Sequence, residues 1–253
     1  MTGEREAQLL AAVDMLLDAR RTLQPIEDLP DELKPVSLDE VFWVQDRVAE
    51  AFGPVGGWKV GAGSLEATPM AAPMPAAWIA PSGSLLVGNR FRGLEAEIAF
   101  MLKDDLPPRP EGYTRGEVYE AVASCHPAIE VLESGLRVPT SAAPMSVWPD
   151  LQMHGGFVYG AAYADWRAVD FHKETVTLAV DGIVRVERTG SNTSGDLWRL
   201  LPWLANDGAK RTGGLRAGQW ITTGSWTGYT LADSPSSVDV RFATMGSVAL
   251  RFE

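Results

Sequence analysis

The sequence contains one cysteine, Cys125, among its 253 residues. A single cysteine forms neither an internal disulfide nor a cluster of thiolate ligands, so a disulfide-stapled secreted fold and a zinc knuckle are excluded. The first twenty residues place acidic side chains before and within their apolar stretch. That is the pattern of neither a secretory signal nor a membrane span, so we expect a cytoplasmic protein with no membrane partner.

Positive charge is also scarce. The chain has 22 Lys and Arg against 33 Asp and Glu, which gives a formal net charge of −11 at pH 7. Proteins that bind nucleic acid need surplus cations to replace the counterions of the phosphates, so we expect no nucleic-acid partner. With 45% hydrophobic and 22% charged residues, the composition is that of a folded globular protein.

The first part of the chain has the spacing of helices. Leucine and valine recur at helical intervals ahead of Arg20 and Arg21, which stand where the end of a helix favours cations. Ser37 and Glu40 have the spacing of a capping box and predict a second helix. We therefore predict an N-terminal helical region over residues 1–78, which ends in a stretch punctuated by proline and glycine.

The remaining residues, 79–253, are predicted to form the main β-rich body. At a period of two, residues 94–102 place Leu94, Ala96, Ile98, Phe100 and Leu102 on one face, which indicates a strand although the residue types favour helix. Residues 114–125 are predicted to form a short helix that Pro127 ends. Alternating segments from Thr175 onward predict further strands. The expected fold class is α+β with an antiparallel or mixed sheet, in one compact unit overall.

Three glutamates are candidate metal ligands. Glu95 and Glu97 lie two residues apart on the predicted strand, so their side chains point the same way from Cα atoms about 6.6 Å apart. Such a pair also suits a solvated strand edge, but Ala99 and Met101 make the same face apolar, and paired anions beside an apolar floor need a cation. Glu130 lies in an apolar strand, where a carboxylate is costly unless it is paired. Three carboxylates without Cys or His favour Mg²⁺ or Mn²⁺ over zinc.

Lys59 is a candidate catalytic residue. It lies in the segment GGWKVGAGS, where glycines let the backbone approach a ligand closely. Burial lowers the pKa of a lysine, so we expect Lys59 to transfer a proton or to hold a substrate anion. The alternative is a surface lysine whose stem covers apolar neighbours.

Weaker candidates lie in two glycine-containing segments. Asp150 and His154 precede a pair of glycines in WPDLQMHGGF. The loop TTGSWTG at 222–228 is predicted either to offer backbone N–H groups to a carboxylate or to be a simple strand end. Candidate substrate-binding residues are Ser64, Thr223 and Ser225. Glu133 is expected to face solvent, on the side of its strand opposite Glu130.

A resemblance to a known family appears when the motifs are taken in order. The segments that carry the resemblance are GWKVGAGS, LEAEIAFMLKDDLP, PAIEVLES, DLQMHGGFVYG, WLAND with LRAGQWITTGS, and GSVALRF. In these segments the chain resembles the 2-keto-4-pentenoate hydratase branch of the fumarylacetoacetate hydrolase superfamily. The resemblance covers nearly the whole chain from about Arg20. It implies a mixed β-roll with N-terminal helices and a Mg²⁺ or Mn²⁺ ion held by Glu95, Glu97 and Glu130, with Lys59 at the position of the family's lysine.

The chain also departs from the family pattern. Met74 stands where the family has an acidic residue, Gly135 where it has an arginine, and His154 where it has a small polar residue. The resemblance therefore implies that the metal-binding part of the site is intact. The part that would position water and the distal end of the substrate differs from the family.

The function that the resemblance implies is lyase chemistry on a 2-hydroxy-2,4-dienoate or 2-oxo-enoate. Water addition would give a 4-hydroxy-2-oxo acid, with Asp150 or His154 as the base that activates water. Decarboxylation of a 2-oxo-enedioate and C–C hydrolysis of an acylpyruvate are alternatives within the superfamily. Two others lie outside catalysis, namely a binder of apolar ligands and a structural subunit. Relatives assemble as homo-oligomers, which we also expect here.

Overall fold

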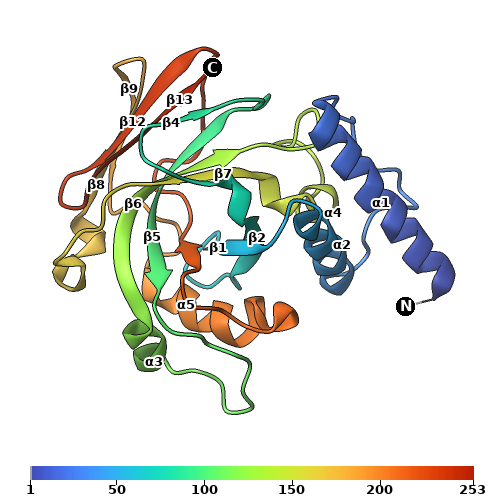
Figure 1. Ribbon diagram of the computed structural model, residues 1–253, viewed down its shortest axis with the longest axis horizontal. Helices are drawn as coiled ribbons and strands as arrows, with labels where there is room; N and C mark the ends of the chain where they lie inside the picture. Colours follow the sequence, from blue (N-terminus) through green and yellow to red (C-terminus); the bar gives the residue numbers. More distant parts are fainter. Residues whose placement is uncertain (1) are drawn as a thin grey trace.

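Two β-sheets and a pair of N-terminal helices make up residues 2–253, the part of the chain that the computed structural model describes (Figure 1). The helices lie at one end of the molecule and the smaller sheet at the other, with the larger sheet between them. This mixed architecture confirms the predicted α+β class. None of the described helices is both long and apolar enough to cross a membrane. Homo-oligomeric assembly stays a prediction.

The two long helices form where the sequence predicts them: α1 (Gly3–Thr22) and α2 (Leu38–Glu50). The Ser37 hydroxyl accepts the backbone N–H of Glu40, as expected of a helix cap. The apolar faces of the two helices pack together in a cluster of their own, which also takes in Leu136 and Leu151 from the β-rich body. The helix pair is thereby attached to the connection between two central strands.

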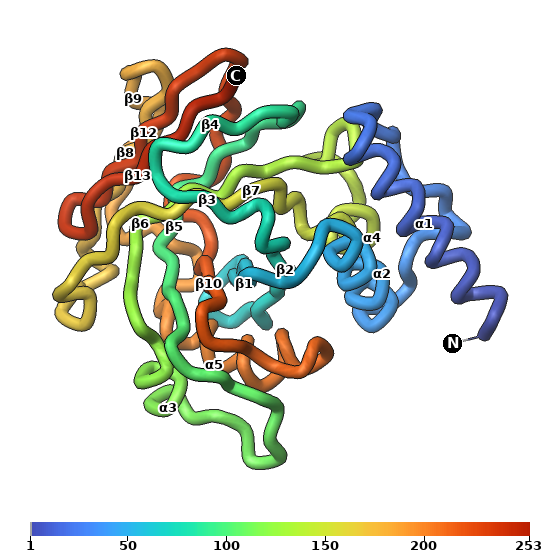
Figure 2. Tube along the Cα trace, in the orientation of Figure 1, coloured from blue at the N-terminus to red at the C-terminus, as the bar shows by residue number. Residues whose placement is uncertain are grey.

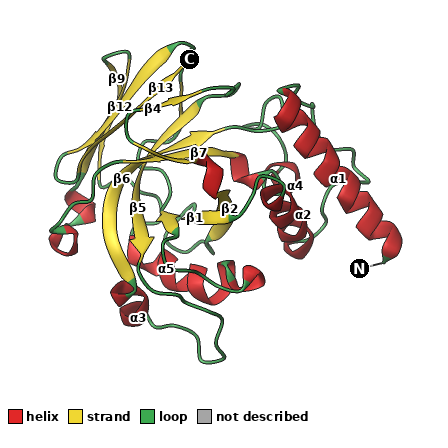
Figure 3. Ribbon diagram, in the orientation of Figure 1, coloured by secondary structure: helices red, strands yellow, loops and turns green. Residues whose placement is uncertain are grey.

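The larger sheet has the strand order β2-β1-β10-β5-β6-β7-β3, with β11 paired to β5 (Figure 3). Strand β10 runs parallel to β1 and antiparallel to β5. The strands are β1 (Val55–Gly61), β2 (Met70–Pro75), β3 (Ile79–Pro81), β5 (Gly93–Leu102), β6 (Val122–Leu132), β7 (His154–Tyr159), β10 (Trp220–Thr222) and β11 (Thr230–Leu231). Strands β1 and β2 lie before residue 78, so the predicted helical region contributes two strands to the larger sheet of the β-rich body. The domain boundary at 78 stays a prediction.

The smaller sheet covers one face of the larger one. Its strands β12 and β13 contact β6, and alternate side chains of β12 are buried between the sheets. This burial gives the main core, in which Phe100, Trp226 and Phe242 are among the largest buried side chains. The strand order is β4 (Ser84–Leu86), β13 (Gly246–Phe252), β12 (Ser236–Phe242), β8 (Thr175–Val180) and β9 (Ile183–Thr189).

Short helical segments connect the sheets, and one of them corrects the sequence-based expectation. The helices are α3 (Arg115–Glu120), α4 (Pro144–Val147) and α5 (Leu200–Trp203). The prediction of helix through Cys125 is wrong, because α3 ends at Glu120 and the chain turns directly into β6 (Figure 2). Pairing with β5 buries Val122 and Cys125, which outweighs the local helix preference, and Pro127 lies inside the strand opposite Ile98.

Candidate metal centre

Three carboxylates converge on the face of the larger sheet that lies away from the main core. Glu95 and Glu97 project from the same side of β5, and Glu130 on β6 is the cross-strand partner of Glu95. One carboxylate oxygen from each lies within 4.8 Å of the others. Glu95 and Glu97 therefore share a face, as strand alternation predicts, and Glu130 joins them; binding of an ion there stays a prediction.

Glu97 is almost fully buried. The Thr222 hydroxyl and the Gly224 backbone N–H, at 3.0 Å, both donate to its Oε2, while Oε1 has no hydrogen-bond partner. Burial, reinforced by the charges of Glu130 and Glu95, raises the pKa of Glu97 well above its ordinary value. Burial and the charge of Glu130 raise the pKa of Glu95 to about 7.

Only one oxygen of the Glu130 carboxylate has hydrogen-bonding or charged partners. Its Oε1 lies 2.8 Å from Lys59 Nζ and 2.9 Å from His154 Nδ1, whereas its buried Oε2 has no partner. Burial alone would raise the pKa of this carboxyl, but the Lys59 charge and the His154 hydrogen bond outweigh it and lower the pKa to about 2. Burial also lowers the pKa of His154, so its imidazole is neutral and donates from Nδ1 to Glu130.

The unpartnered oxygens show that the cluster fits a divalent cation. Glu97 Oε1 and Glu130 Oε2 are buried acceptors without donors, a costly arrangement that a bound cation removes. The ligand set is oxygen only, which suits Mg²⁺ or Mn²⁺. Glu95, Glu97 and Glu130 would hold the ion.

Lys59 faces the carboxylates from β1. Its Nζ donates to the backbone carbonyl of Gln152 at 3.0 Å as well as to Glu130. The expectation that burial lowers the pKa of Lys59 is wrong, because the charges of Glu130 and Glu95 outweigh burial and raise the pKa. Lys59 is therefore an ammonium that can hold an anion or donate a proton.

The cluster opens into a cavity of about 190 Å³. The cavity is lined by Lys59, Val60, Gly61, Ala62, Gly63, Thr68, Met70, Glu95, Glu97, Glu130, Gln152 and Gly224. Its lining thus combines the three carboxylates with the Lys59 ammonium and a glycine-rich stretch of chain.

The cavity lining contains none of the three predicted substrate-binding residues. Ser64 is exposed and donates to Glu66, and Thr223 Oγ1 donates to the Ile98 carbonyl. Ser225 Oγ donates to the Gly228 carbonyl, and the Ser225 side chain also hydrogen-bonds Glu95, which opposes the rise in the pKa of that carboxyl.

The loop 222–228 does offer a backbone N–H to a carboxylate, since Gly224 donates to Glu97. Sequence reasoning missed the Thr222 hydroxyl, which donates to the same oxygen. Strand alternation contains the signal, since Thr222 is paired with Lys59 and shares its face.

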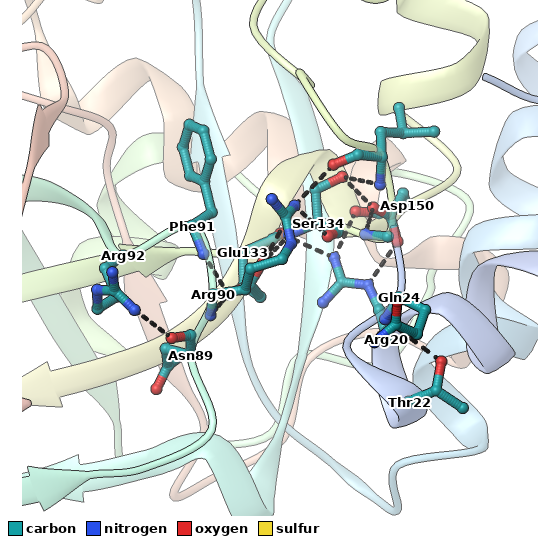
Figure 4. Close-up of polar contacts among 12 residues, drawn as sticks. Arg20, Thr22, Gln24, Asn89, Arg90, Phe91, Arg92, Glu133, Ser134 and Asp150 are labelled. Atoms are coloured by element: carbon teal, nitrogen blue, oxygen red, sulfur yellow. Dashed lines mark hydrogen bonds and ion pairs between the residues drawn. The ribbon is translucent and has the colours of Figure 1, made fainter. Parts of the chain in front are cut away.

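Asp150 lies behind the cavity, in a buried polar network with α1 (Figure 4). Arg20 forms an ion pair with its Oδ1, and the Ser134 hydroxyl and the Gly135 N–H both donate to its Oδ2. Arg20 also donates to the His154 carbonyl at 2.9 Å. These contacts occupy both Asp150 oxygens, and they favour a positioning role for Asp150 over the predicted role as a base.

Glu133 belongs to the same region and corrects another expectation. The prediction that it faces solvent is wrong, because its side chain is buried where the chain leaves β6. The backbone N–H groups of Arg90 and Phe91 donate to Glu133 Oε2, and those contacts come from a loop distant in sequence (Figure 4). Glu133 therefore fastens the segment before β5 to the end of β6.

The turn that links Asp150 to β7 has an uncommon backbone. Three successive residues that are not glycine, Leu151, Gln152 and Met153, have positive φ values of 54°, 51° and 66°. A left-handed conformation costs about 1–2 kcal/mol for each such residue. The turn persists because Asp150 and His154, at its two ends, are both held by Arg20.

Two of the departures from the family pattern have structural reasons. Met74 is buried in an apolar cluster on the cavity side of the sheet, beside Ala99 and Trp220. At Gly135, an added Cβ would lie 3.1 Å from Ala19 Cβ in α1, so the position leaves no room for an arginine without moving that helix.

Added Mg²⁺ is expected to raise the melting temperature of the protein, because the ion replaces repulsion among the three carboxylates with attraction. At a concentration about 100 times the Kd, the gain is about 2.7 kcal/mol, or roughly 5–10 °C for a chain of this size. Differential scanning fluorimetry with and without EDTA measures it. An equal melting temperature under both conditions would contradict metal binding.

Comparison with known proteins gives curated relatives of similar sequence, although no family model matches the chain. The chain is 28% identical over 158 residues to 2-hydroxyhexa-2,4-dienoate hydratase of Comamonas testosteroni, covering 62% of this chain and 59% of that one. It is 29% identical over 159 residues to 4-oxalocrotonate decarboxylase of Pseudomonas putida, covering 63% and 59%. A third relative, 2-oxo-hept-4-ene-1,7-dioate hydratase of Escherichia coli, is 26% identical over 164 residues, covering 63% and 61%. The matched segment thus spans about three fifths of each relative.

Solved structures share the fold over more of the chain. The 4-oxalocrotonate decarboxylase from Pseudomonas putida G7, complexed with magnesium and adipate, has a TM-score of 0.85 at 24% identity and covers 100% of this chain and 99% of its own. A protein assigned to the fumarylacetoacetate hydrolase family from Yersinia pestis has a TM-score of 0.59 at 17% identity, covering 79% and 93%. The predicted β-roll and the resemblance stated from the motifs are both confirmed.

Proposed function

From the fold of the fumarylacetoacetate hydrolase superfamily, and from a sequence similar to two hydratases, we propose that this chain is a metal-dependent hydro-lyase. Its substrate would be a 2-hydroxy-2,4-dienoate or the tautomeric 2-oxo-enoate, and its product a 4-hydroxy-2-oxo acid. The observation that carries the proposal is the group of three carboxylates with two buried unpartnered oxygens, next to an ammonium.

Glu95, Glu97 and Glu130 are the proposed holders of the ion. When bound, a divalent cation supplies positive charge against the carboxylate and 2-oxygen of a 2-oxo acid. Thr222 and Gly224 fix the orientation of Glu97 through its Oε2 and leave Oε1 free. The chain thus orients its acidic oxygens before any ligand arrives.

Lys59 is the proposed proton carrier. Its Nζ is held between Glu130 and the Gln152 carbonyl, so the ammonium stays at the cavity wall. From there it can neutralise a substrate carboxylate or deliver a proton from Nζ to a substrate carbon. His154, whose Nδ1 donates to Glu130, sets the orientation of that carboxylate from behind. The activation of water by Asp150 or His154 stays a prediction that their contacts do not favour.

The direct test is a spectrophotometric assay. Purified protein is mixed with 2-hydroxypenta-2,4-dienoate and Mg²⁺, and the loss of the diene absorbance is followed over time. We expect loss of the diene with Mg²⁺ or Mn²⁺ and none with EDTA. Unchanged absorbance with both metals would refute the hydratase assignment.

Decarboxylation is a second candidate, because the sequence is as similar to a 4-oxalocrotonate decarboxylase as it is to the hydratases. Both reactions begin with a 2-oxo acid head that binds a cation, so the three carboxylates do not separate them. Release of CO₂ from a 2-oxo-3-enedioate, measured beside the diene assay, distinguishes the two activities.

A further inference from the structure

One polar group in the cavity has no partner and no place in the proposed mechanism. Gln152 lines the cavity beside Lys59 and Glu130, and its Nε2 is buried without a hydrogen-bond partner. A buried amide donor left without an acceptor is unfavourable, and native structures leave few of them. A donor kept free at the wall of a cavity indicates that a ligand supplies the acceptor.

The backbone fixes where this side chain points. Gln152 is the middle residue of the left-handed turn, and its own carbonyl accepts the Lys59 ammonium. The next carbonyl, on Met153, accepts the N–H of Glu133 at 2.8 Å. The turn is thus held on both sides of the Gln152 side chain, which makes the carboxamide a positioned group.

We propose that Gln152 is a specificity-determining residue, whose Nε2 donates a hydrogen bond to an acceptor oxygen that the substrate carries beyond its 2-oxo acid head. This inference rests on the proposed function, in which the head lies at the three carboxylates. Gln152 lies next to the cluster, because its carbonyl accepts the Lys59 ammonium that also binds Glu130. Its carboxamide carries no charge to bind the ion, so we place it against the part of the substrate that follows the head. The ligand class is a 2-oxo acid with a second carboxylate or carbonyl group.

The test compares matched ligands in the presence of Mn²⁺ by isothermal titration calorimetry. Three diacids, oxaloacetate, 2-oxoglutarate and 2-oxoadipate, are paired with the monoacids of equal chain length, and oxalate serves as the head alone. We expect one of the diacids to bind about tenfold or more tightly than its matched monoacid, the effect of one hydrogen bond to a charged acceptor. The chain length of the preferred diacid also shows how far from the 2-oxo acid head the acceptor oxygen lies.

Two variants locate that preference. Gln152→Met keeps the length of the side chain without the donor, and Gln152→Gly removes the side chain while relieving the left-handed backbone. We expect both to abolish the preference for the diacid and to lower oxalate affinity far less than diacid affinity. The inference is overturned if no diacid is preferred, if the preference survives in both variants, or if oxalate affinity falls as far as diacid affinity. Absence of oxalate binding to the unmodified protein would instead refute the proposed function.

Discussion

Replacement of Glu97 by glutamine is expected to lower kcat/KM for the diene by about 10³-fold or more, because the cation loses a charged ligand and several kcal/mol of charge stabilisation with it. The same change is expected to stabilise the metal-free protein. Glu97 is buried among like charges that raise its pKa, and a neutral amide removes that repulsion. Activity and stability therefore move in opposite directions.

The comparison needs three measurements on the Glu97→Gln variant: turnover, the Mg²⁺-dependent shift in melting temperature, and stability in EDTA. Glu187→Gln is the matched control, since Glu187 is exposed on β9 and undergoes the same chemical change away from the cavity. A non-catalytic binder of apolar ligands would keep its ligand affinity in the Glu97 variant. Full turnover in that variant would contradict the assignment of Glu97 as a ligand.

Replacement of Arg20 by methionine is expected to lower the free energy of unfolding by about 3–5 kcal/mol. The guanidinium is buried, and besides its ion pair with Asp150 it donates to the carbonyls of Glu133 and His154. Methionine fills part of the volume but leaves the Asp150 carboxylate buried without its charged partner, which is the costly way to break an internal ion pair. The left-handed turn also loses the contacts that hold its two ends.

Urea titration followed by tryptophan fluorescence measures this loss. Arg21→Met is the control on the same helix, because Arg21 is exposed and its one hydrogen bond, to the Ala51 carbonyl, is 3.4 Å long. The control is expected to change stability by less than about 1 kcal/mol. Equal losses in the two variants would show that the buried network contributes no more than a surface contact.

The three carboxylates were predictable as candidates because each has a signal in its own short segment, although the pairing of Glu130 with Glu95 joins two separate strands. Alternation along β5 places Glu95 and Glu97 on one face whatever the rest of the chain does. Glu130 was identifiable from its apolar flanks, since a lone acid in a buried strand requires a partner. These two local rules account for all three proposed ligands.

The remaining parts of the site depend on contacts between segments distant in sequence. The pKa of Lys59 follows from glutamates on two other strands, and Glu133 is buried by a loop about forty residues before it. Arg20 was predicted only as a cation at the end of a helix, yet its partner lies 130 residues further along the chain. Local patterns contain no signal for such pairs.

The link from α1 to the far side of the candidate site also bears on how the molecule unfolds. The helix pair has its own apolar cluster and would, on that ground alone, be free to melt as a separate unit. Arg20 couples the helix pair to the strands around Glu130. Release of α1 would leave the buried Asp150 carboxylate without its charged partner and would free the turn that contains Gln152. Helix and sheet therefore come apart in a single cooperative transition, in which the most protected amides of both elements show the same free energy of opening.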